Sequence, residues 1–276
     1  MKIYKLHSFP NREFKAKIDK ILKNIPALGK LLSSIFGVFE YFILEFFRKL
    51  DRKFDFYTMG FVNRYILKGR WGGRVVPLNL NIDVNTKFST SQEILEILKR
   101  SNVAAIGKCY CRSTQRKYDK PNCDHPIYSC IHLGVGKSLY EVPYKSNNLK
   151  KVSKEEIEEL LLESDRRGLV HQLIYFPNPQ FYYVVCNCCP CCCVVLNKFI
   201  KYGAPHMIKS DFVAKTDLDK CTNCGTCEKW CYFGSRKLIA DKLNVNSQKC
   251  FGCGICVSKC PNKAISLIQK KERIEL

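Results

Sequence analysis

Eight cysteines near the C-terminus form two runs that share one spacing, C-x2-C-x2-C-x3-C. Three cysteines at two-residue gaps wrap the chain around one [4Fe-4S] core, and the fourth begins a helix that carries it to the neighbouring core. The spacing therefore predicts two clusters whose ligands cross between the runs. The first cluster would be held by Cys221, Cys224, Cys227 and Cys260, and the second by Cys250, Cys253, Cys256 and Cys231.

The residues between these cysteines suit the same chemistry. Gly225 and Gly254 hold equivalent places in the two runs, where the lack of a side chain lets the backbone approach cluster sulfide and direct N–H groups at it. Zinc is a poor alternative, because zinc sites usually combine two C-x2-C pairs that lie far apart in the sequence. The runs differ after their last cysteine, where Tyr232 stands in the first and Pro261 in the second.

The segment that contains both runs, about 216–268, resembles the bacterial-type 2[4Fe-4S] ferredoxins. Its two halves also match beyond the cysteines, since Ser235 aligns with Ala264 and the pair Leu238-Ile239 aligns with Leu267-Ile268. The resemblance implies an α+β fold of two short hairpins and two helices, with electron transfer as the activity.

Ten further cysteines lie in the middle of the chain, and none precedes Cys109. Six of them fall within the eight residues 186–193, where adjacent side chains point in different directions. Neighbours such as Cys188 and Cys189 would thus serve different irons, different clusters or the core. Some of the ten could be buried, idle thiols. Uncommitted neighbouring thiols oxidise readily, however, so we expect at least one more metal centre, with iron–sulfur favoured over zinc. It would be a [4Fe-4S] cluster or a larger non-cubane one, with candidate ligands Cys109, Cys111, Cys123, Cys130, Cys186, Cys188 and Cys189.

From about Pro77 onward the chain resembles a family of poorly characterised iron–sulfur proteins from anaerobes. In that family a C-x-C-R…C-D-H-P…C segment and a C-N-C-C-x-C-C-C segment precede a dicluster ferredoxin domain. The matching residues here begin at Cys109, Cys123 and Cys186. The resemblance implies redox work in an anaerobic metabolism and no assigned substrate.

Four other side chains near the cysteines are considered for a role at a metal centre. Arg112 would either donate hydrogen bonds to cluster sulfide or pair with an acidic residue. His125 and His132 are candidate ligands, although a loop histidine is more often a hydrogen-bonding residue. His171 begins an apolar, strand-like run and is interpreted as structural.

The pattern of apolar and turn residues predicts an α+β protein with three regions. These are a helical N-terminal region at 1–75, a mixed α/β cysteine-rich domain at 76–215, and a ferredoxin-like dicluster domain at 216–276. A glycine-rich stretch at 69–77 is interpreted as a linker or turn cluster.

Within the cysteine-rich domain we expect a helix near 91–99 and a second one that begins at Ser153. Ser153 and Glu156 have the spacing of a capping box, and Gly168 stands where that helix would end. Strands are predicted at 103–106, 169–175 and 181–185.

Residues 31–50 carry an apolar stripe at helical spacing between basic flanks. Its most apolar part, 31–47, is shorter than the roughly 20 residues of a membrane span. It is therefore interpreted first as a packed core helix, second as an interfacial helix and last as a true span. The N-terminus lacks the apolar region of a signal peptide. A reducing, cytoplasmic setting is expected, with membrane-surface contact through 31–50 left open.

The chain has 276 residues and a formal charge of +21. Each oxidised [4Fe-4S] cluster with four thiolates carries about −2, so two or three clusters would still leave a basic protein. We therefore expect acidic redox proteins as partners. Nucleic acid is not expected, because the basic residues are dispersed and no recognition motif is present.

Two functions remain open at this stage. The first is an electron-transfer protein or subunit with two C-terminal clusters and a further central one. The second is an oxidoreductase in which the central cluster acts directly on a substrate such as a thiol or disulfide. No dinucleotide-binding fingerprint, hydrolase elbow or nucleotide-binding loop supports another enzyme class.

Overall fold

The computed structural model of the protein describes residues 69–78, 104–118, 122–133, 149–178, 181–203 and 206–270, together with isolated residues and short runs before 95. The predicted segment 31–50 and the predicted helix near 91–99 lie outside this part of the chain, apart from single residues. No helix among the described residues is both long enough and apolar enough to cross a membrane.

Seven strands form one mixed sheet in the order β4-β2-β3-β6-β5-β1-β7. Neighbouring strands are antiparallel except for β1 and β7, which are parallel. The strands are β1 (Gly72–Val75), β2 (Ala104–Lys108), β3 (Tyr128–Leu133), β4 (Lys150–Lys151), β5 (Val170–Tyr175), β6 (Tyr182–Cys188) and β7 (Met207–Ile208).

The three strands predicted in this region are confirmed as β2, β5 and β6. Strand β6 continues past the predicted end, so that Cys186 and Cys188 lie within the strand rather than beyond it. The cysteines of this segment are therefore positioned by the pleat of a central strand, in which residues i and i+2 face the same side.

The predicted helix after Ser153 is also confirmed, as α6 (Lys154–Arg166). The Glu156 N–H donates to Ser153 Oγ at 3.2 Å, and the Ser153 N–H donates to Glu156 Oε2 at 2.7 Å, which completes the capping box. Gly168 follows the helix with a φ of 69°, a conformation that favours glycine.

The prediction of a linker at 69–77 is wrong, because this stretch contains strand β1. Its glycines are needed for close packing rather than for a turn. A Cβ on Gly72 would lie 2.4 Å from the His206 carbonyl oxygen, and one on Gly73 would lie 2.2 Å from Gln172 Oε1. Strand β1 lies on the N-terminal side of the predicted boundary at 75/76, and the three regions proposed above stay predictions.

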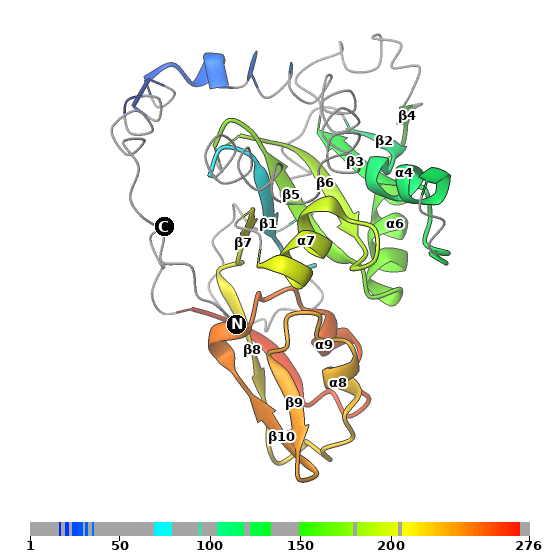
Figure 1. The fold of residues 1–276 in the computed structure, drawn as a ribbon, viewed down its shortest axis with the longest axis vertical. Helices are drawn as coiled ribbons and strands as arrows, with labels where there is room; N and C mark the ends of the chain where they lie inside the picture. The colour runs from blue at the N-terminus through cyan, green and yellow to red at the C-terminus, as the bar shows by residue number, and fades with distance from the viewer. Residues whose placement is uncertain are drawn as a thin grey trace.

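Apolar side chains cover both faces of the sheet. Leu173 and Val185 pack with Ile157 and Leu161 of α6 on one face. The alternate residues, which include Val184, pack on the other face with α7 (Val194–Tyr202). Figure 1 shows α6 and α7 beside the central strands, with α4 (Tyr110–Tyr118) next to β2 and β3.

The C-terminal module contains two small sheets and two short helices. Strands β9 (Arg236–Ile239) and β10 (Lys242–Val245) form a hairpin. The second expected hairpin is instead a pairing of the first and last strands of the module, β8 (Phe212–Thr216) and β11 (Ile265–Gln269). The helices are α8 (Thr226–Lys229) and α9 (Ile255–Ser258).

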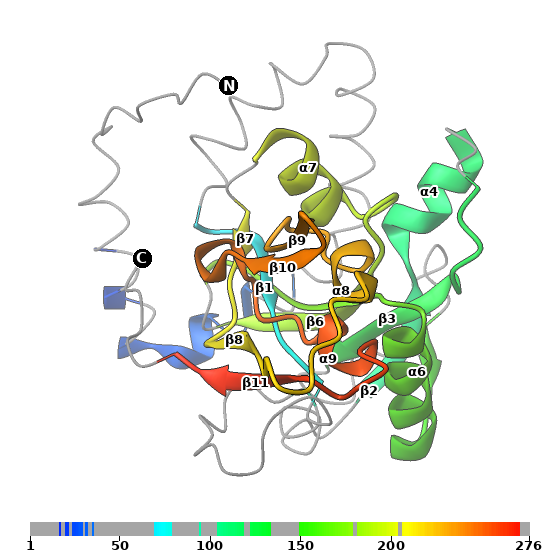
Figure 2. The same cartoon turned by 90° about the horizontal axis from the view of Figure 1, so that it is seen from below.

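The module packs against the end of the seven-stranded sheet that carries α7 (Figures 1 and 2). Phe251 contacts Phe199 of α7 edge-to-face at 4.8 Å between ring centroids, and it stacks on Phe233 at 4.2 Å. Tyr232 Oη donates a hydrogen bond to the Gly168 carbonyl oxygen at 3.0 Å. Tyr232 follows the last cysteine of the first run, where the second run has Pro261, and this tyrosine therefore joins the module to the end of α6.

Candidate metal centres

Two quartets of cysteines in the C-terminal module each surround a small cavity. The first cavity is about 20 Å³ and is lined by Cys221, Cys224, Cys227 and Cys260. The second is also about 20 Å³ and is lined by Cys231, Cys250, Cys253 and Cys256. We call these the outer and the inner quartet. The structure thus groups the eight cysteines as the crossed spacing predicted, and each group has the all-thiolate donor set that a [4Fe-4S] core takes.

Backbone N–H groups point at the sulfurs in a repeated pattern. Ser235 donates to Cys231 Sγ at 3.2 Å, and its repeat partner Ala264 donates to Cys260 Sγ at 3.3 Å. Gly225 and Gly254 precede α8 and α9 with φ values of 75° and 84°, which a larger residue adopts only with strain. These glycines line the two cavities, so their backbone would approach a bound cluster closely.

Arg236 lies buried between the two quartets. Its guanidinium donates to Thr216 Oγ1 at 2.8 Å and to the Ala214 carbonyl oxygen at 3.2 Å. Burial opposes its charge, yet negative charge on Cys256 and Cys227 raises the pKa of Arg236 above its ordinary value. With clusters bound, the thiolates of the two quartets would supply negative charge on both sides of this buried cation.

The outer quartet is the more accessible of the two. Cys224 is exposed, and the neighbouring Leu218 leaves 77% of its surface in solvent. In the inner quartet Cys250 and Cys256 are buried, and Cys253 packs against the apolar core beneath the sheet. The inner quartet thus faces the cysteine-rich domain.

Six of the ten central cysteines form a closed ring in which each thiol interacts with two others. We call this set the six-cysteine ring. In ring order its members are Cys109, Cys111, Cys193, Cys188, Cys186 and Cys130. All six belong to, or pack against, the apolar core that also contacts Cys253.

Secondary structure explains how residues far apart in the sequence meet in this ring. Cys186 and Cys188 are alternate residues of β6, and Cys130 lies opposite Cys186 on β3, with 3.8 Å between their sulfurs. Cys193 caps the N-terminus of α7, where the Leu196 N–H donates to its sulfur at 3.4 Å. A hydrogen bond with Cys111 opposes the shift, but hydrogen bonding to Cys188 and burial raise the pKa of Cys193 well above its ordinary value.

The ring borders a cavity of about 60 Å³, three times the volume of either ferredoxin cavity. Hydrogen bonds from Cys111 and Cys130 lower the pKa of Cys109 well below its ordinary value. Hydrogen bonds from Cys186 and Cys193 likewise lower the pKa of Cys188. Thiolates are therefore favoured at two opposite positions of the ring.

His132 also lines this cavity. Burial lowers its pKa to about 4, so the imidazole is neutral near pH 7. It offers a neutral nitrogen at the edge of the ring and no positive charge.

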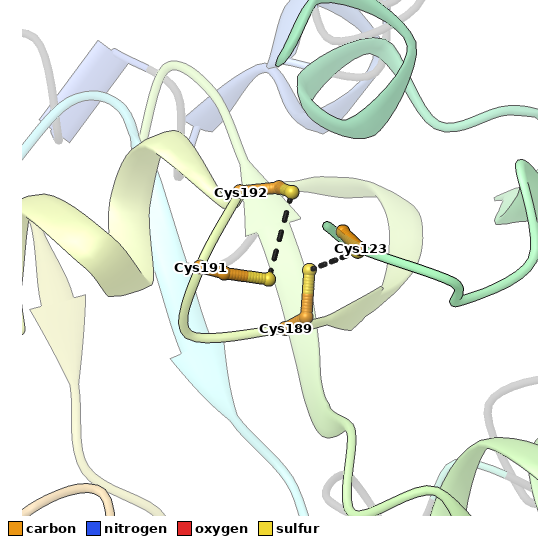
Figure 3. A group of neighbouring side chains, drawn as sticks. All are labelled: Cys123, Cys189, Cys191 and Cys192. Carbon is orange, nitrogen blue, oxygen red and sulfur yellow. Dashed lines mark hydrogen bonds between the residues drawn. The ribbon is translucent and has the colours of Figure 1, made fainter. Parts of the chain in front are cut away.

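The remaining four central cysteines form a separate, compact cluster of thiols, here called the four-cysteine group (Figure 3). Its members are Cys123, Cys189, Cys191 and Cys192, and their four sulfurs all lie within 4.8 Å of one another. Cys123 Sγ is 3.9 Å from Cys189 Sγ, and Cys191 Sγ is 3.6 Å from Cys192 Sγ. Three of the four are buried, and Cys191 is exposed.

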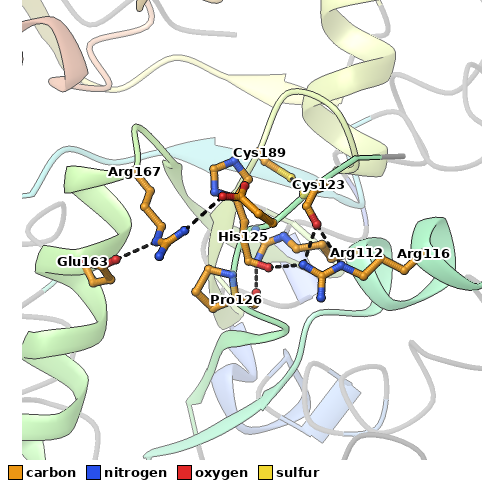
Figure 4. Close-up of polar contacts among 9 residues, drawn as sticks. Arg112, Arg116, Cys123, His125, Pro126, Glu163, Arg167 and Cys189 are labelled. Carbon is orange, nitrogen blue, oxygen red and sulfur yellow. Dashed lines mark hydrogen bonds and ion pairs between the residues drawn. The ribbon is translucent and has the colours of Figure 1, made fainter. Parts of the chain in front are cut away.

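Arginines fix the loop that carries Cys123 (Figure 4). Arg116 donates to the carbonyl oxygens of Cys123 and His125, at 2.6 and 2.7 Å. Arg112 donates to the Pro126 carbonyl oxygen, and Arg167 lies 3.7 Å from the Asp124 carboxylate. The C-D-H-P sequence therefore supplies one thiol and a set of anchors, and His125 lies outside the compact thiol cluster.

Arg112 lies fully buried between the six-cysteine ring and the four-cysteine group. It donates to Ser129 Oγ at 2.8 Å and to the Asn187 carbonyl oxygen at 2.7 Å, while its Nε has no hydrogen-bond partner among the described residues. Burial opposes its charge, but negative charge on Cys109 and Cys189 raises its pKa. No carboxylate within the described ranges pairs with Arg112, which favours the interpretation that it faces anionic sulfur.

The seven central ligands predicted from the sequence do not form one group. Five lie in the six-cysteine ring, whereas Cys123 and Cys189 lie in the four-cysteine group. The neighbours Cys188 and Cys189 are divided between the two sets, as alternating side-chain directions require. Cys191, Cys192 and Cys193 were not among the ligands predicted from the sequence. The C-x-C spacing of Cys186 and Cys188, in contrast, is the signal of two thiols on one face of a strand.

Comparison with known proteins identifies the C-terminal module. The 4Fe-4S binding domain family matches residues 243–266. A 47-residue segment is 40% identical to a subunit of the ion-translocating oxidoreductase complex of Methanosarcina acetivorans, over 17% of this chain and 18% of that protein. A 55-residue segment is 38% identical to the PorD subunit of pyruvate synthase from Methanothermobacter marburgensis, over 20% of this chain and 64% of that protein.

The chain thus spans less than two thirds of either relative, and no solved structure matches it. These findings show a C-terminal 4Fe-4S binding domain of ferredoxin type and support an iron–sulfur electron-transfer role. Both relatives are named as subunits of larger enzymes.

Proposed function

We propose that the chain is an electron-transfer subunit in which the two ferredoxin clusters exchange electrons with a further iron–sulfur centre held by the six-cysteine ring. The observation that carries this proposal is the shared apolar core. Cys253 of the inner quartet packs against the same core to which all six ring cysteines belong or pack. A cluster in the inner quartet would thus lie between the outer cluster and the ring.

The accessibility of the quartets supports an order for the electron path. The outer quartet has the exposed Cys224 and the exposed apolar Leu218 beside it, which suits transient contact with a redox protein. The formal charge of +21 favours an acidic partner. In this arrangement the partner meets the outer cluster, and the inner cluster connects it to the central centre.

The dimensions of the ring support a centre larger than one cubane. It offers six thiols rather than four, around a cavity three times the volume of either ferredoxin cavity. Arg112 supplies buried positive charge beside it, as Arg236 does between the ferredoxin quartets. A polynuclear, anionic centre fits both the donor set and the charge.

The test removes one ring thiol. Cys188→Ala should lose the iron bound by the ring and keep the roughly eight irons of the two [4Fe-4S] clusters, with their EPR signals intact. Val185→Ala is the matched control, because Val185 is equally buried in the same strand but packs on the opposite face. If Cys188→Ala retains all of the wild-type iron, the ring holds no cluster and the proposal fails.

A second measurement tests the path itself. Rapid-freeze EPR after mixing with a reduced acidic electron carrier should show the central signal forming more slowly in Cys224→Ser than in wild type. An unchanged rate would contradict entry through the outer cluster.

The cavity beside the ring supports a second candidate function, an oxidoreductase whose central centre acts on a substrate. Its discriminating test is the addition of small thiols or disulfides to the anaerobic protein. A change confined to the central EPR signal would favour this candidate, whereas an unaffected signal would favour simple electron transfer.

A further inference from the structure

We infer that the four-cysteine group binds a single tetrahedral divalent metal ion, zinc or iron, separate from every iron–sulfur cluster of the protein. The inference concerns Cys123, Cys189, Cys191 and Cys192 and does not depend on what the six-cysteine ring holds.

The distances between the sulfurs carry the argument. A metal ion with tetrahedral thiolate ligands at about 2.3 Å places those sulfurs about 3.8 Å apart. The group has two sulfur–sulfur distances of 3.6 and 3.9 Å, and the remaining ones stay within 4.8 Å. A [4Fe-4S] core separates its thiolates more widely, because a different iron stands in front of each sulfur.

The ferredoxin quartets provide an internal comparison. They have the cysteine spacing of cubane sites, and their sulfurs surround cavities of about 20 Å³. In the described part of the chain, no other set of three or more potential ligand atoms from Cys, His, Asp or Glu lies as close together as the four-cysteine group. The sulfurs of the ferredoxin quartets thus surround cavities, whereas the sulfurs of the four-cysteine group lie close together.

The packing separates the site from the ring as well. Cys123, Cys189 and Cys192 share a small buried contact cluster with Leu169, while the six ring cysteines belong to the larger core. Arg112 lies between the two sets and balances negative charge on both sides. A divalent ion with four thiolates carries about −2, which such a neighbour stabilises.

The position of the site indicates a structural role. It joins the loop that carries Cys123 to the turn between β6 and α7, two segments about 66 residues apart in the sequence. Four protein ligands leave no open position for a substrate, as in structural zinc sites. Because Cys189 and Cys192 also border the cavity of the ring, the ion would fix one wall of that cavity.

The test compares two exposed thiols. Cys191→Ser removes one ligand of the four-cysteine group, and Cys224→Ser removes one ligand of the outer quartet. Full-length protein purified anaerobically is analysed for zinc, iron and inorganic sulfide, and by native mass spectrometry. We expect Cys191→Ser to lose one metal ion per chain and no sulfide, while Cys224→Ser alters the outer cluster and keeps that ion.

Metal analysis then separates zinc from iron, and X-ray absorption at the edge of the bound metal should show four sulfur neighbours and no metal neighbour. The inference is overturned if Cys191→Ser loses several irons together with sulfide, since the site would then hold a cluster. It is also overturned if Cys191→Ser has the metal content of wild type. An empty six-cysteine ring, seen as an unchanged iron content in Cys188→Ala, would defeat the proposed function alone.

Discussion

The C-terminal module and the cysteine-rich domain each bury an arginine among cysteines, but different chain architectures bring those cysteines together. Arg236 in the module and Arg112 in the domain are the two largest fully buried side chains among the described residues, and each lies between two groups of cysteines. In the module, short loops with two-residue gaps supply the thiols. In the domain, strands and a helix N-terminus bring them together from segments far apart in the sequence. The comparison shows that each region buries an arginine beside cysteine sulfur, whose negative charge would offset the cost of burying the cation.

The largest effect is expected from removing these two charges. Arg236→Met and Arg112→Met should each lower the free energy of unfolding by about 3–5 kcal/mol, because buried negative charge is left uncompensated. The reduction potentials of the centres on both sides should fall, since a nearby cation favours the reduced, more negative form. Anaerobic denaturation and EPR-monitored redox titration measure the two effects.

Lysine at the same positions is the control. Arg236→Lys and Arg112→Lys keep the positive charge, so the reduction potentials of the neighbouring centres should stay close to their wild-type values. The proposed similarity of the two regions is contradicted if Arg236→Met shifts a reduction potential and Arg112→Met shifts none. The central thiols would then be neutral, and the similarity between the two regions would be one of packing alone.

A smaller effect is expected at the contact between the two regions. Gly168 has a φ of 69°, and a Cβ there would lie 2.2 Å from Trp230 Cζ3. Gly168→Ala should cost about 1–2 kcal/mol for the left-handed backbone, and more for the displaced indole. Gly203 has a φ of 66°, and a Cβ there would meet no atom within 4 Å, so Gly203→Ala should show the backbone cost alone. Equal losses of stability in the two variants would show that Trp230 moves freely.

The smallest effect is expected far from the cysteines. Ser153→Ala removes the capping box of α6 and should lower the free energy of unfolding by about 1 kcal/mol, whereas Ser153→Thr should retain most of it. Iron content and EPR signals should be unchanged in both variants. Loss of iron in Ser153→Ala would show that cluster binding depends on overall stability, and the cysteine variants would then need reinterpretation.

The sequence predicted those features that depend on local spacing. The capping box of α6 and the strands β5 and β6 follow from residues within a few positions of one another, and the grouping of the eight C-terminal cysteines follows from a spacing that occurs twice. The prediction of a linker at 69–77 was wrong because glycine occurs both in turns and at closely packed positions of strands. Gly72 and Gly73 allow close packing of a strand, whereas the sequence alone suggested a turn.

The central site could be predicted only in part, because its grouping is tertiary. Cys130 joins the ring through its register with Cys186, and Cys123 joins the other group through a loop held by arginines. Neither relation leaves a short-range signal in the sequence. Tyr232 is a similar case. It stands where the second run has a proline, and only its hydrogen bond to the Gly168 carbonyl oxygen in the structure shows its role.

The pleat of β6 makes the length of this segment as important as its composition. Cys186 and Cys188 contribute to one face. Between them, Asn187 Oδ1 accepts a hydrogen bond from His171 Nδ1 at 2.6 Å, and Asn187 Nδ2 donates to the Ser129 carbonyl oxygen at 2.8 Å. Insertion or deletion of a single residue before Cys186 would exchange the two faces of the strand. Both thiols would then leave the ring together, so a one-residue change of length here should remove two ring ligands at once.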